Sequence, residues 1–147
     1  MRFTRRQTLA LVGGAAALAA APRLAYAAAD ADAVIAAFAG GATPQTGRIK
    51  LTAPEIAENG NSVPVSLAVE SPMTEADHVS EVLLVAMGNP NPRVAAFRFS
   101  TLSGGASATT RVRLARTQEM VALARMSDGS VFMDRAEVKV TIGGCGG

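Results

Sequence analysis

The sequence predicts an all-β domain, an immunoglobulin-like antiparallel β-sandwich, preceded by one short helix and followed by a flexible tail. Three observations favour this fold. Short apolar segments recur at intervals of about ten residues, turn-forming Gly, Asn, Asp and Pro separate them, and little of the chain has helical periodicity. A length of 147 residues and a hydrophobic content of 49% fit one globular domain and exclude collagen-like, coiled-coil and disulfide-rich classes.

The first 27 residues have the pattern of a twin-arginine export signal. Arg5 and Arg6 precede an apolar run over residues 9–21, and Ala25-Tyr26-Ala27 places small residues at a cleavage site. The run is shorter than the roughly 20 residues that span a bilayer as a helix, so we expect no membrane anchor. We therefore predict a signal peptide over residues 1–27 and a folded, periplasmic protein that begins at residue 28.

The basic character of the sequence lies in this signal peptide. The whole chain has a formal net charge of +2, but four of its arginines lie in the first 27 residues and no acidic residue precedes Asp30. The rest of the chain has ten Lys or Arg and twelve Asp or Glu, a net charge of −2. Nucleic-acid binding requires a clustered basic face, so we expect no nucleic-acid partner.

A short helix is expected to open the domain over residues 28–142. Asp30-Ala31-Asp32 can cap its N-terminus, and Gly40-Gly41 can end it. Its apolar residues at helical spacing are Val34, Ile35 and Phe38. We expect this helix to be a surface lid or a docking element.

Three segments with strand patterns follow. Residues 48–52 alternate polar and apolar side chains, and residues 63–69 place four apolar side chains on one face, with Pro64 on the other face indicating the start of an edge strand. Residues 79–87 are almost continuously apolar, which predicts a central buried strand. The Gly-Asn-Pro-Asn-Pro turn at 88–92 ends it.

The second half repeats this theme. The expected strands are residues 94–99, 109–114, 118–126, 131–133 and 137–142. Asp128-Gly129 is the strongest hairpin signal in the chain. Arg111, Arg113 and Arg116 alternate with apolar residues, which predicts a strand with one apolar and one basic, solvated face.

Few residues of the mature chain are suited to catalysis. It has no Trp, no Tyr and a single His, His78, which lacks neighbouring ligands at metal-binding spacing and is interpreted as a solvated loop residue. The carboxylates fall in loops and at strand ends, where acidic residues commonly lie, and the methionines are expected to fill the core or an interface. We assign no catalytic residue, metal or cofactor.

Cys145 is the exception. It is the only cysteine, and Gly143-Gly144 and Gly146-Gly147 flank it at the C-terminus. The last expected strand ends at Ile142, and three extended residues would carry the sulfur about 10 Å further. Glycines remove neighbouring side chains and permit any φ and ψ. We interpret residues 143–147 as a thin, flexible carrier arm whose thiol can enter a narrow cleft in another protein.

The chemistry of the thiol points to a carrier rather than an enzyme. An ordinary cysteine is mostly protonated at neutral pH, and no neighbouring residue in the sequence activates Cys145. Activation must then come from the protein that receives the arm. We therefore interpret Cys145 as the attachment point of a carried group, acted on by partner enzymes.

Three segments together resemble SoxY, the family of sulfur-carrier subunits in the periplasmic thiosulfate-oxidising (Sox) system. They are the Gly-Gly-Cys-Gly-Gly terminus, residues 54–65 (PEIAENGNSVPV) and the turn at 126–130 (MSDGS). The resemblance extends over essentially the whole mature chain. It implies that Cys145 holds sulfur covalently, first as an S-thiosulfonate and then as a persulfide.

The resemblance also implies partners. They are a SoxZ-like immunoglobulin-like subunit that forms a heterodimer with this chain, a c-type cytochrome, a dimanganese hydrolase and a molybdenum-containing sulfane dehydrogenase. Export of the folded heterodimer would explain a twin-arginine signal on a chain without a cofactor. Whether the sulfur is oxidised fully to sulfate or passed to a store, and which strands face the partner, stays open.

Two other functions remain open. Ubiquitin-like sulfur carriers also end in Gly-Gly, but they are activated in the cytoplasm, and the export signal argues against that class. Alternatively, the chain is an exported structural or interaction module whose Cys145 forms an intermolecular disulfide, which an oxidising periplasm permits. Covalent sulfur adducts on Cys145 would distinguish these functions.

Overall fold

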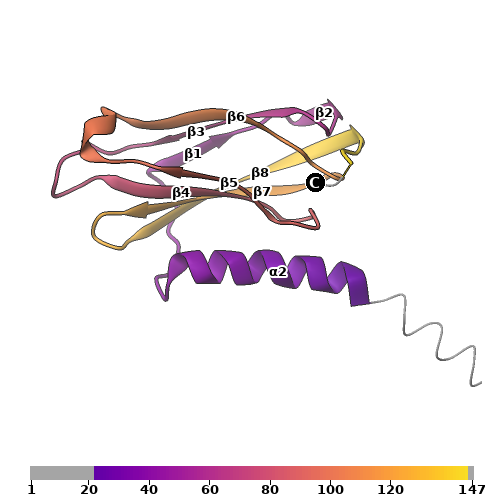
Figure 1. The fold of residues 1–147 in the computed structure, drawn as a ribbon, viewed down its shortest axis with the longest axis horizontal. Helices are drawn as coiled ribbons and strands as arrows, with labels where there is room; N and C mark the ends of the chain where they lie inside the picture. The colour runs from indigo at the N-terminus through magenta and orange to yellow at the C-terminus, as the bar shows by residue number, and fades with distance from the viewer. Residues whose placement is uncertain (1–21, 146–147) are drawn as a thin grey trace, which may run out of the picture.

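The computed structural model describes residues 22–145 as two β-sheets packed face to face, with one helix against the outer face of the larger sheet (Figure 1). The smaller sheet has the order β1-β3-β6, and its strands are β1 (Ile49–Thr52), β3 (Val63–Val69) and β6 (Ala106–Val112). The larger sheet has the order β2-β8-β7-β4-β5, and its strands are β2 (Ile56–Asn59), β8 (Val131–Ile142), β7 (Gln118–Met126), β4 (Val79–Ala86) and β5 (Arg93–Arg98). The predicted β-sandwich is confirmed.

One strand pairing differs from the predicted antiparallel arrangement. After β1 the chain crosses to the larger sheet, where β2 runs parallel to β8, and it then returns to the smaller sheet as β3. The sequence patterns do not predict β2, because it has four residues and only one buried side chain, Ala57. In the parallel register Asn59 lies opposite Ile142, so the turn after β2 and the end of β8 are neighbours.

Strand β3 shows the alternation that the sequence predicts. Its apolar side chains at 63, 65, 67 and 69 are buried, and Pro64 points outward. However, β3 is the middle strand of its sheet and not an edge strand. Pro64 is tolerated there because the ladder to β1 reaches only as far as Ser66, opposite Thr52, and leaves Pro64 beyond the end of β1.

Strands β4 and β7 are buried on both faces. Their inward side chains pack between the sheets, and their outward side chains pack against the helix. The outer cluster comprises Ala31, Phe38, Leu83, Val85, Val121, Leu123 and Val131. β7 is the middle strand of the larger sheet, and β4, the predicted central strand, lies beside it between β7 and β5. Burial on two faces explains why both segments are apolar with little alternation.

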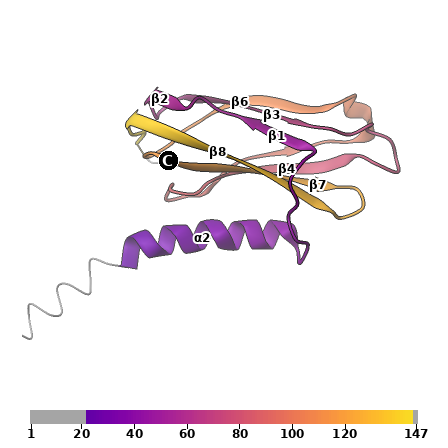
Figure 2. The same cartoon turned by 180° about the vertical axis from the view of Figure 1, so that it is seen from behind.

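The helix α2 (Pro22–Ala39) covers the larger sheet, as the view from behind also shows (Figure 2). It ends at Ala39, and Gly40 and Gly41, both with positive φ, follow it as the predicted stop. It begins earlier than expected, so Asp30 lies within the helix and not at its cap. Because Phe38 is buried against the sheet, α2 is a packed layer of the domain rather than a lid on its surface.

A cluster of charges fixes the C-terminal end of α2. The Arg125 guanidinium lies 4.3 Å from the centroid of the Phe38 ring and donates a hydrogen bond to the Phe38 carbonyl. It also pairs with Glu81, whose carboxylate is 3.2 Å away. Arg93 and Arg98 approach the same carboxylate. Glu81, to which the sequence assigned no role, thus connects the helix to the sheet.

The hairpin between β7 and β8 confirms the Asp128-Gly129 signal. Gly129 has a φ of 86°, and the Asp128 carboxylate accepts hydrogen bonds from the Ser130 hydroxyl and amide. These bonds lower the pKa of Asp128, the hydroxyl contributing most. After this turn the two predicted strands at 131–133 and 137–142 form one continuous strand, β8. Among residues 22–145 no helix carries an apolar run that could cross a lipid bilayer.

Candidate functional site

Cys145 lies beyond the end of β8, at the same end of the sandwich as β2 (Figure 1). Its side chain is exposed and its thiol is free. Strand β8 ends at Ile142, where the sequence predicts it to end, and Gly143 and Gly144 connect it to the cysteine. The remaining arm residues, Gly146 and Gly147, lie outside the described part of the chain, as do Arg5 and Arg6.

The chain leading to Cys145 is held by backbone hydrogen bonds. The Gly144 amide donates to the Leu114 carbonyl at 2.8 Å, and the Leu114 amide donates to the Gly60 carbonyl at 2.8 Å. The Gly60 amide in turn donates to the Ile142 carbonyl at 2.7 Å. The turn between β2 and β3, the loop between β6 and β7, and the end of β8 are therefore joined at one place.

One side chain extends this arrangement to the cysteine itself. The Cys145 amide donates to Oδ1 of Asn61 at 3.2 Å, across a sequence separation of 84 residues. Asn61 is in turn positioned by its own amide, which donates to the Asn59 side chain. We call the residues that contact the end of the chain, Gly60, Asn61, Leu114 and Ala115, the tail seat.

The glycines at the tail seat allow backbone to approach backbone. A Cβ on Gly143 would lie 2.2 Å from the Ala115 carbonyl oxygen, and one on Gly144 would lie 2.8 Å from the Gly60 carbonyl oxygen. The sequence interpretation assigned both glycines to flexibility, but here the contacts exclude any side chain. The predicted flexible arm over residues 143–147 is thus anchored to the domain through residue 144 in this structure, while the Cys145 side chain extends outward.

We expect Gly60→Ala to destabilise the protein. The new Cβ would lie 2.2 Å from the Leu114 carbonyl oxygen, so the backbone of the tail seat must move. We expect a loss of about 1–3 kcal/mol in the free energy of unfolding, measured by urea denaturation. Gly105→Ala is the matched control, because its Cβ would meet no atom within 4 Å; its effect should be within about 0.5 kcal/mol or slightly stabilising. Equal losses in the two variants would contradict this packing.

A buried network of side-chain amides holds the loop that contains Leu114 and Ala115 of the tail seat. Asn89 is fully buried, and its Nδ2 donates to the Arg113 carbonyl at 2.8 Å. Its Oδ1 accepts from the Ala115 amide at 3.0 Å and from Nε2 of Gln118 at 2.8 Å. The residues on both sides of Leu114 are therefore fixed by one side chain. Because each polar atom of Asn89 is paired, the network can remain buried.

Gln118 completes this network. Its Oε1 accepts from the Gly88 amide at 2.8 Å, and its Nε2 also donates to the Arg116 carbonyl at 3.0 Å. Sequence reasoning placed Asn89 in a turn and gave it no role. No sequence signal separates it from Asn91, because both precede a proline in the same turn; only the fold buries one and exposes the other.

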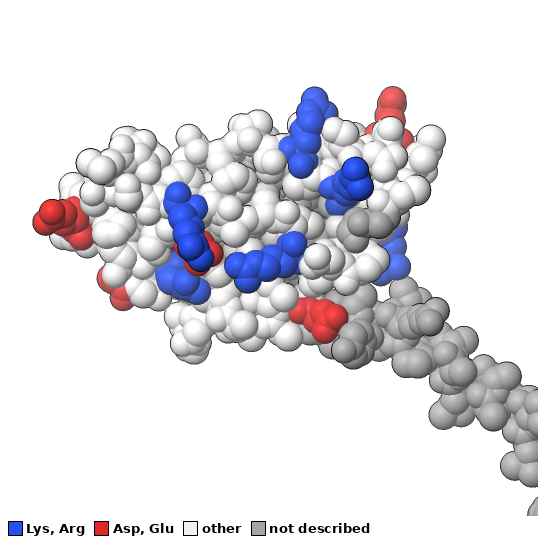
Figure 3. All heavy atoms as spheres, viewed as in Figure 1, with Lys and Arg blue, Asp and Glu red and all other residues white. Residues whose placement is uncertain are grey.

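Exposed arginines flank the tail seat. Arg111 lies on β6, and Arg113 and Arg116 lie in the following loop on either side of Leu114 and Ala115. The exposed side chains agree with the predicted basic, solvated face. Figure 3 shows Lys and Arg side chains gathered over the β5 and β6 side of the molecule. Glu58 on β2 adds an exposed carboxylate two residues before Gly60.

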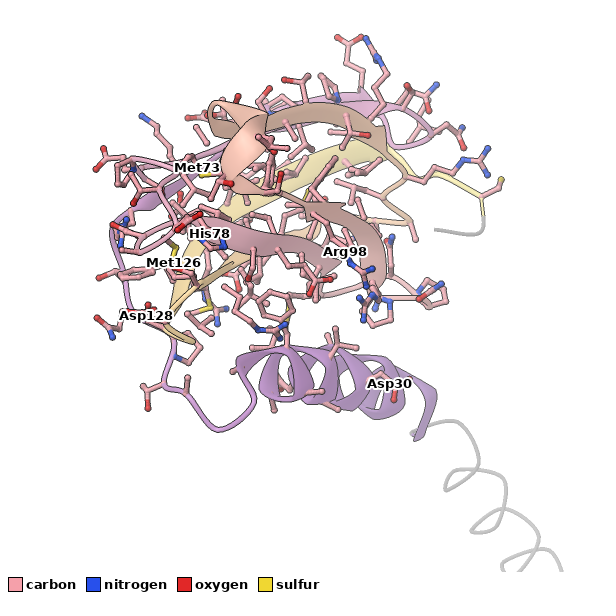
Figure 4. All side chains as sticks on the ribbon, turned by 60° about the vertical axis from the view of Figure 1, so that its left-hand side comes forward. Asp30, Met73, His78, Arg98, Met126 and Asp128 are labelled. Carbon is pink, nitrogen blue, oxygen red and sulfur yellow. The ribbon has the colours of Figure 1, made fainter. Side chains whose placement is uncertain are left out.

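The single histidine lies far from this site. His78 is in the loop before β4, where its Nδ1 is 2.9 Å from the Thr74 carbonyl oxygen. Figure 4 places it with Met73, Met126 and Asp128 at the end of the sandwich opposite to the end of β8. Within residues 22–145 no group of three or more His, Cys, Asp or Glu side chains is placed to hold a metal ion.

The geometry presents a thiol without surrounding it with catalytic groups. In the described part of the chain no hydrogen bond reaches Sγ of Cys145, and the hydrogen bond that this residue makes there is donated by its backbone amide. A group attached to the sulfur would therefore extend into solvent and would not displace the packed core. The site is suited to carrying a covalent adduct to another protein.

Comparisons with known proteins agree with this geometry. A family model described as "Sulfur oxidation protein SoxY" matches residues 35–145, a range that ends at the exposed cysteine. The solved structure of the sulfur carrier protein SoxY from Chlorobium limicola f thiosulfatophilum is 33% identical, with a TM-score of 0.63; the match covers 76% of this chain and 96% of that chain. A search of curated proteins finds no match.

Other solved structures share the fold alone. Superoxide reductase (neelaredoxin) from Ignicoccus hospitalis is 22% identical with a TM-score of 0.57, and the match covers 65% of this chain and 81% of that chain. A putative superoxide reductase from Thermotoga maritima is 19% identical with a TM-score of 0.53, covering 63% and 84%. The two-sheet architecture is therefore common to proteins with different functions.

Proposed function

The chain belongs to the SoxY family of sulfur oxidation proteins, which are sulfur carriers rather than catalysts, and on this premise we propose that Cys145 is the residue that carries the sulfur. One observation supports this assignment above the others. The only cysteine of the chain is exposed at the last residue of the family match, and only its backbone is tied to the domain. Its sulfur is thus available to other proteins.

The proposed cycle takes place on this sulfur. The c-type cytochrome removes two electrons as the Cys145 thiol and thiosulfate join through a sulfur–sulfur bond, and the thiol proton is released. The dimanganese hydrolase then adds water to the terminal sulfonate, so sulfate leaves and a cysteine persulfide remains. The sulfane dehydrogenase then removes six electrons from the outer sulfur of that persulfide while three water molecules supply its oxygens, which gives a cysteine S-sulfonate. A second hydrolysis releases sulfate and restores the thiol. The carrier itself supplies the attachment atom.

The tail seat sets which bonds must open for the sulfur to reach a partner. With the Gly144 amide held on Leu114 and the Cys145 amide held on Asn61, the free length of chain begins after the Cys145 amide. Breaking the bond from the Cys145 amide to Asn61, and then the bond from the Gly144 amide to Leu114, would lengthen it. A net cost of about 0.5–1.5 kcal/mol for each bond is small enough for binding to a partner to offset it.

The proposal includes a compartment and a set of partners. Residues 1–27, with Arg5 and Arg6, serve as a twin-arginine signal, so the domain acts in the periplasm after cleavage before residue 28. A SoxZ-like subunit forms a heterodimer with this chain and is exported with it. The cytochrome, the hydrolase and the sulfane dehydrogenase each receive the arm in turn. The family membership supports these partners, because sulfur carriers act through other proteins.

Intact-protein mass spectrometry of periplasmic extracts tests this function. From cells grown on thiosulfate, we expect the mass of a chain that begins at Ala28, increased by a thiosulfonate or by one or more sulfur atoms. Treatment with a thiol reductant should return the unmodified mass, because the adducts are bound through sulfur–sulfur bonds. A mass equal to two linked chains would instead support the interaction module with an intermolecular disulfide, and unmodified protein alone would contradict the carrier.

A further inference from the structure

Three arginines around the tail seat form no ion pair with a carboxylate in residues 30–145. We call Arg111, Arg113 and Arg116 the arginine rim; all three side chains are exposed. Every other arginine in residues 30–145 lies within 4.0 Å of a carboxylate oxygen. None of the rim arginines forms such a pair within the same range. The unpaired arginines of the domain are therefore concentrated where the chain leaves it for Cys145.

The rim is positioned by the same bonds that hold the end of the chain. The Arg113 and Arg116 carbonyls accept hydrogen bonds from Asn89 and Gln118, and Leu114 between them accepts from Gly144. The Arg111 guanidinium donates to the carbonyl and hydroxyl oxygens of Ser62, the residue after Asn61. The backbone positions that bear these side chains and the base of the arm are therefore held together.

The length of the arm requires that a partner contact this surface. Even with the hydrogen bonds of the tail seat broken, residues 143–145 span at most about 10 Å between the end of β8 and the thiol, so a cleft that receives the thiol must have its mouth close to Leu114. The rim arginines then lie in the contact. A buried, unpaired charge is costly, whereas an opposite charge on the partner turns the same group into a source of specificity and of faster association.

We propose that the arginine rim binds acidic side chains at the mouth of the enzyme cleft that receives Cys145. This inference rests on the proposed carrier function and adds the chemistry of the docking contact. The chain after residue 27 has a net charge of −2, so its overall charge does not attract an acidic partner. The rim acts locally: it orients the domain so that the arm points into the cleft.

The test compares reversal of charge on and away from the rim. The rim variant is Arg113→Glu with Arg116→Glu, which leaves the contact of Arg111 with Ser62 in place. The matched control is Lys50→Glu on β1, where an exposed cation also lacks an ion pair within residues 30–145 but lies on the far edge of the smaller sheet. Thiosulfate-dependent reduction of the c-type cytochrome is measured against carrier concentration at low and high salt.

We expect the rim variant to raise the KM for the carrier roughly tenfold or more at low salt, with little change in kcat. The difference in KM between the rim variant and the wild type should shrink at high salt, because salt screens the contact. Lys50→Glu should change KM less than about twofold. Alkylation of Cys145 by iodoacetamide should be the same in all three proteins, since thiol exposure is unchanged. Urea denaturation checks that each variant is folded, and Arg113→Gln gives a milder second variant if the double variant is not.

Several outcomes would overturn the inference. Equal KM values for the rim variant and Lys50→Glu would show that the rim does not face the partner. A fall in kcat without a change in KM would show that the arginines act on the bound sulfur group and not on an acidic mouth. Absence of cytochrome reduction with the wild-type carrier would instead refute the proposed function, and the docking contact with it.

Discussion

Cys145→Ser should abolish thiosulfate-dependent electron transfer through the carrier and leave the stability of the domain unchanged. A serine hydroxyl cannot form the sulfur–sulfur bond on which the proposed cycle depends. The thiol is exposed and accepts no hydrogen bond within residues 22–145, so the free energy of unfolding should change by less than about 0.5 kcal/mol. Cytochrome reduction and urea denaturation measure the two effects.

A second cysteine provides the control for position. Leu102 lies in the 3-10 turn η1 (Thr101–Ser103) and is 94% exposed, so Leu102→Cys places an exposed thiol away from the tail seat. In the Cys145→Ser background this thiol should react with small alkylating reagents but should not restore electron transfer. Restored transfer would show that the partner enzymes do not require a thiol at the end of the chain.

Asn89→Ala should destabilise the protein strongly and loosen the tail seat. The substitution removes the side-chain partner of the Arg113 carbonyl and of the Ala115 amide, and it removes one of the two acceptors of Nε2 of Gln118. Each buried polar group left unpaired costs about 1–3 kcal/mol, so we expect a loss of about 3 kcal/mol or more in urea denaturation. Faster hydrogen exchange at the Gly144 amide, which bonds to Leu114, should accompany the loss.

Asn91→Ala is the matched control, since Asn91 occupies the same turn and also precedes a proline, but is exposed. Its loss of stability should be within about 0.5 kcal/mol. Similar losses in the two variants would mean that the turn as a whole, and not the buried amide of Asn89, holds the loop between β6 and β7. Unchanged hydrogen exchange at the Gly144 amide in Asn89→Ala would show that the Asn89 network does not hold the tail seat in place.

Local patterns in the sequence predicted the features that depend on neighbouring residues. Alternation over residues 63–69 predicted the buried face of β3, because successive side chains of a strand point to opposite faces. Asp128-Gly129 predicted a hairpin, because the turn needs a positive φ that glycine accepts readily. The exposed position of Cys145 follows from its place beyond the last strand, and that place is visible in the sequence.

Such local patterns do not determine which strands pair with each other. Alternation shows which face of a strand is buried but not which strand lies beside it, so the parallel pairing of β2 with β8 could not be predicted. The same limit explains the error at Pro64, which was expected on an edge strand. The same limit applies to the helix. Its apolar residues predicted α2, but only the packing of α2 on the larger sheet shows that Phe38 is buried and that the helix forms a third layer.

The tail seat shows most clearly which features the sequence determines and which depend on the tertiary structure. The sequence by itself determined that one cysteine, flanked by glycines, follows the last strand. Only the tertiary structure decided that Gly144 rests on Leu114, that Asn61 binds the Cys145 amide across 84 residues, and that Asn89 is buried beneath them. The physical reason is that backbone conformation depends on neighbouring residues, whereas burial and hydrogen-bond pairing depend on which distant segments the packed sheets bring together.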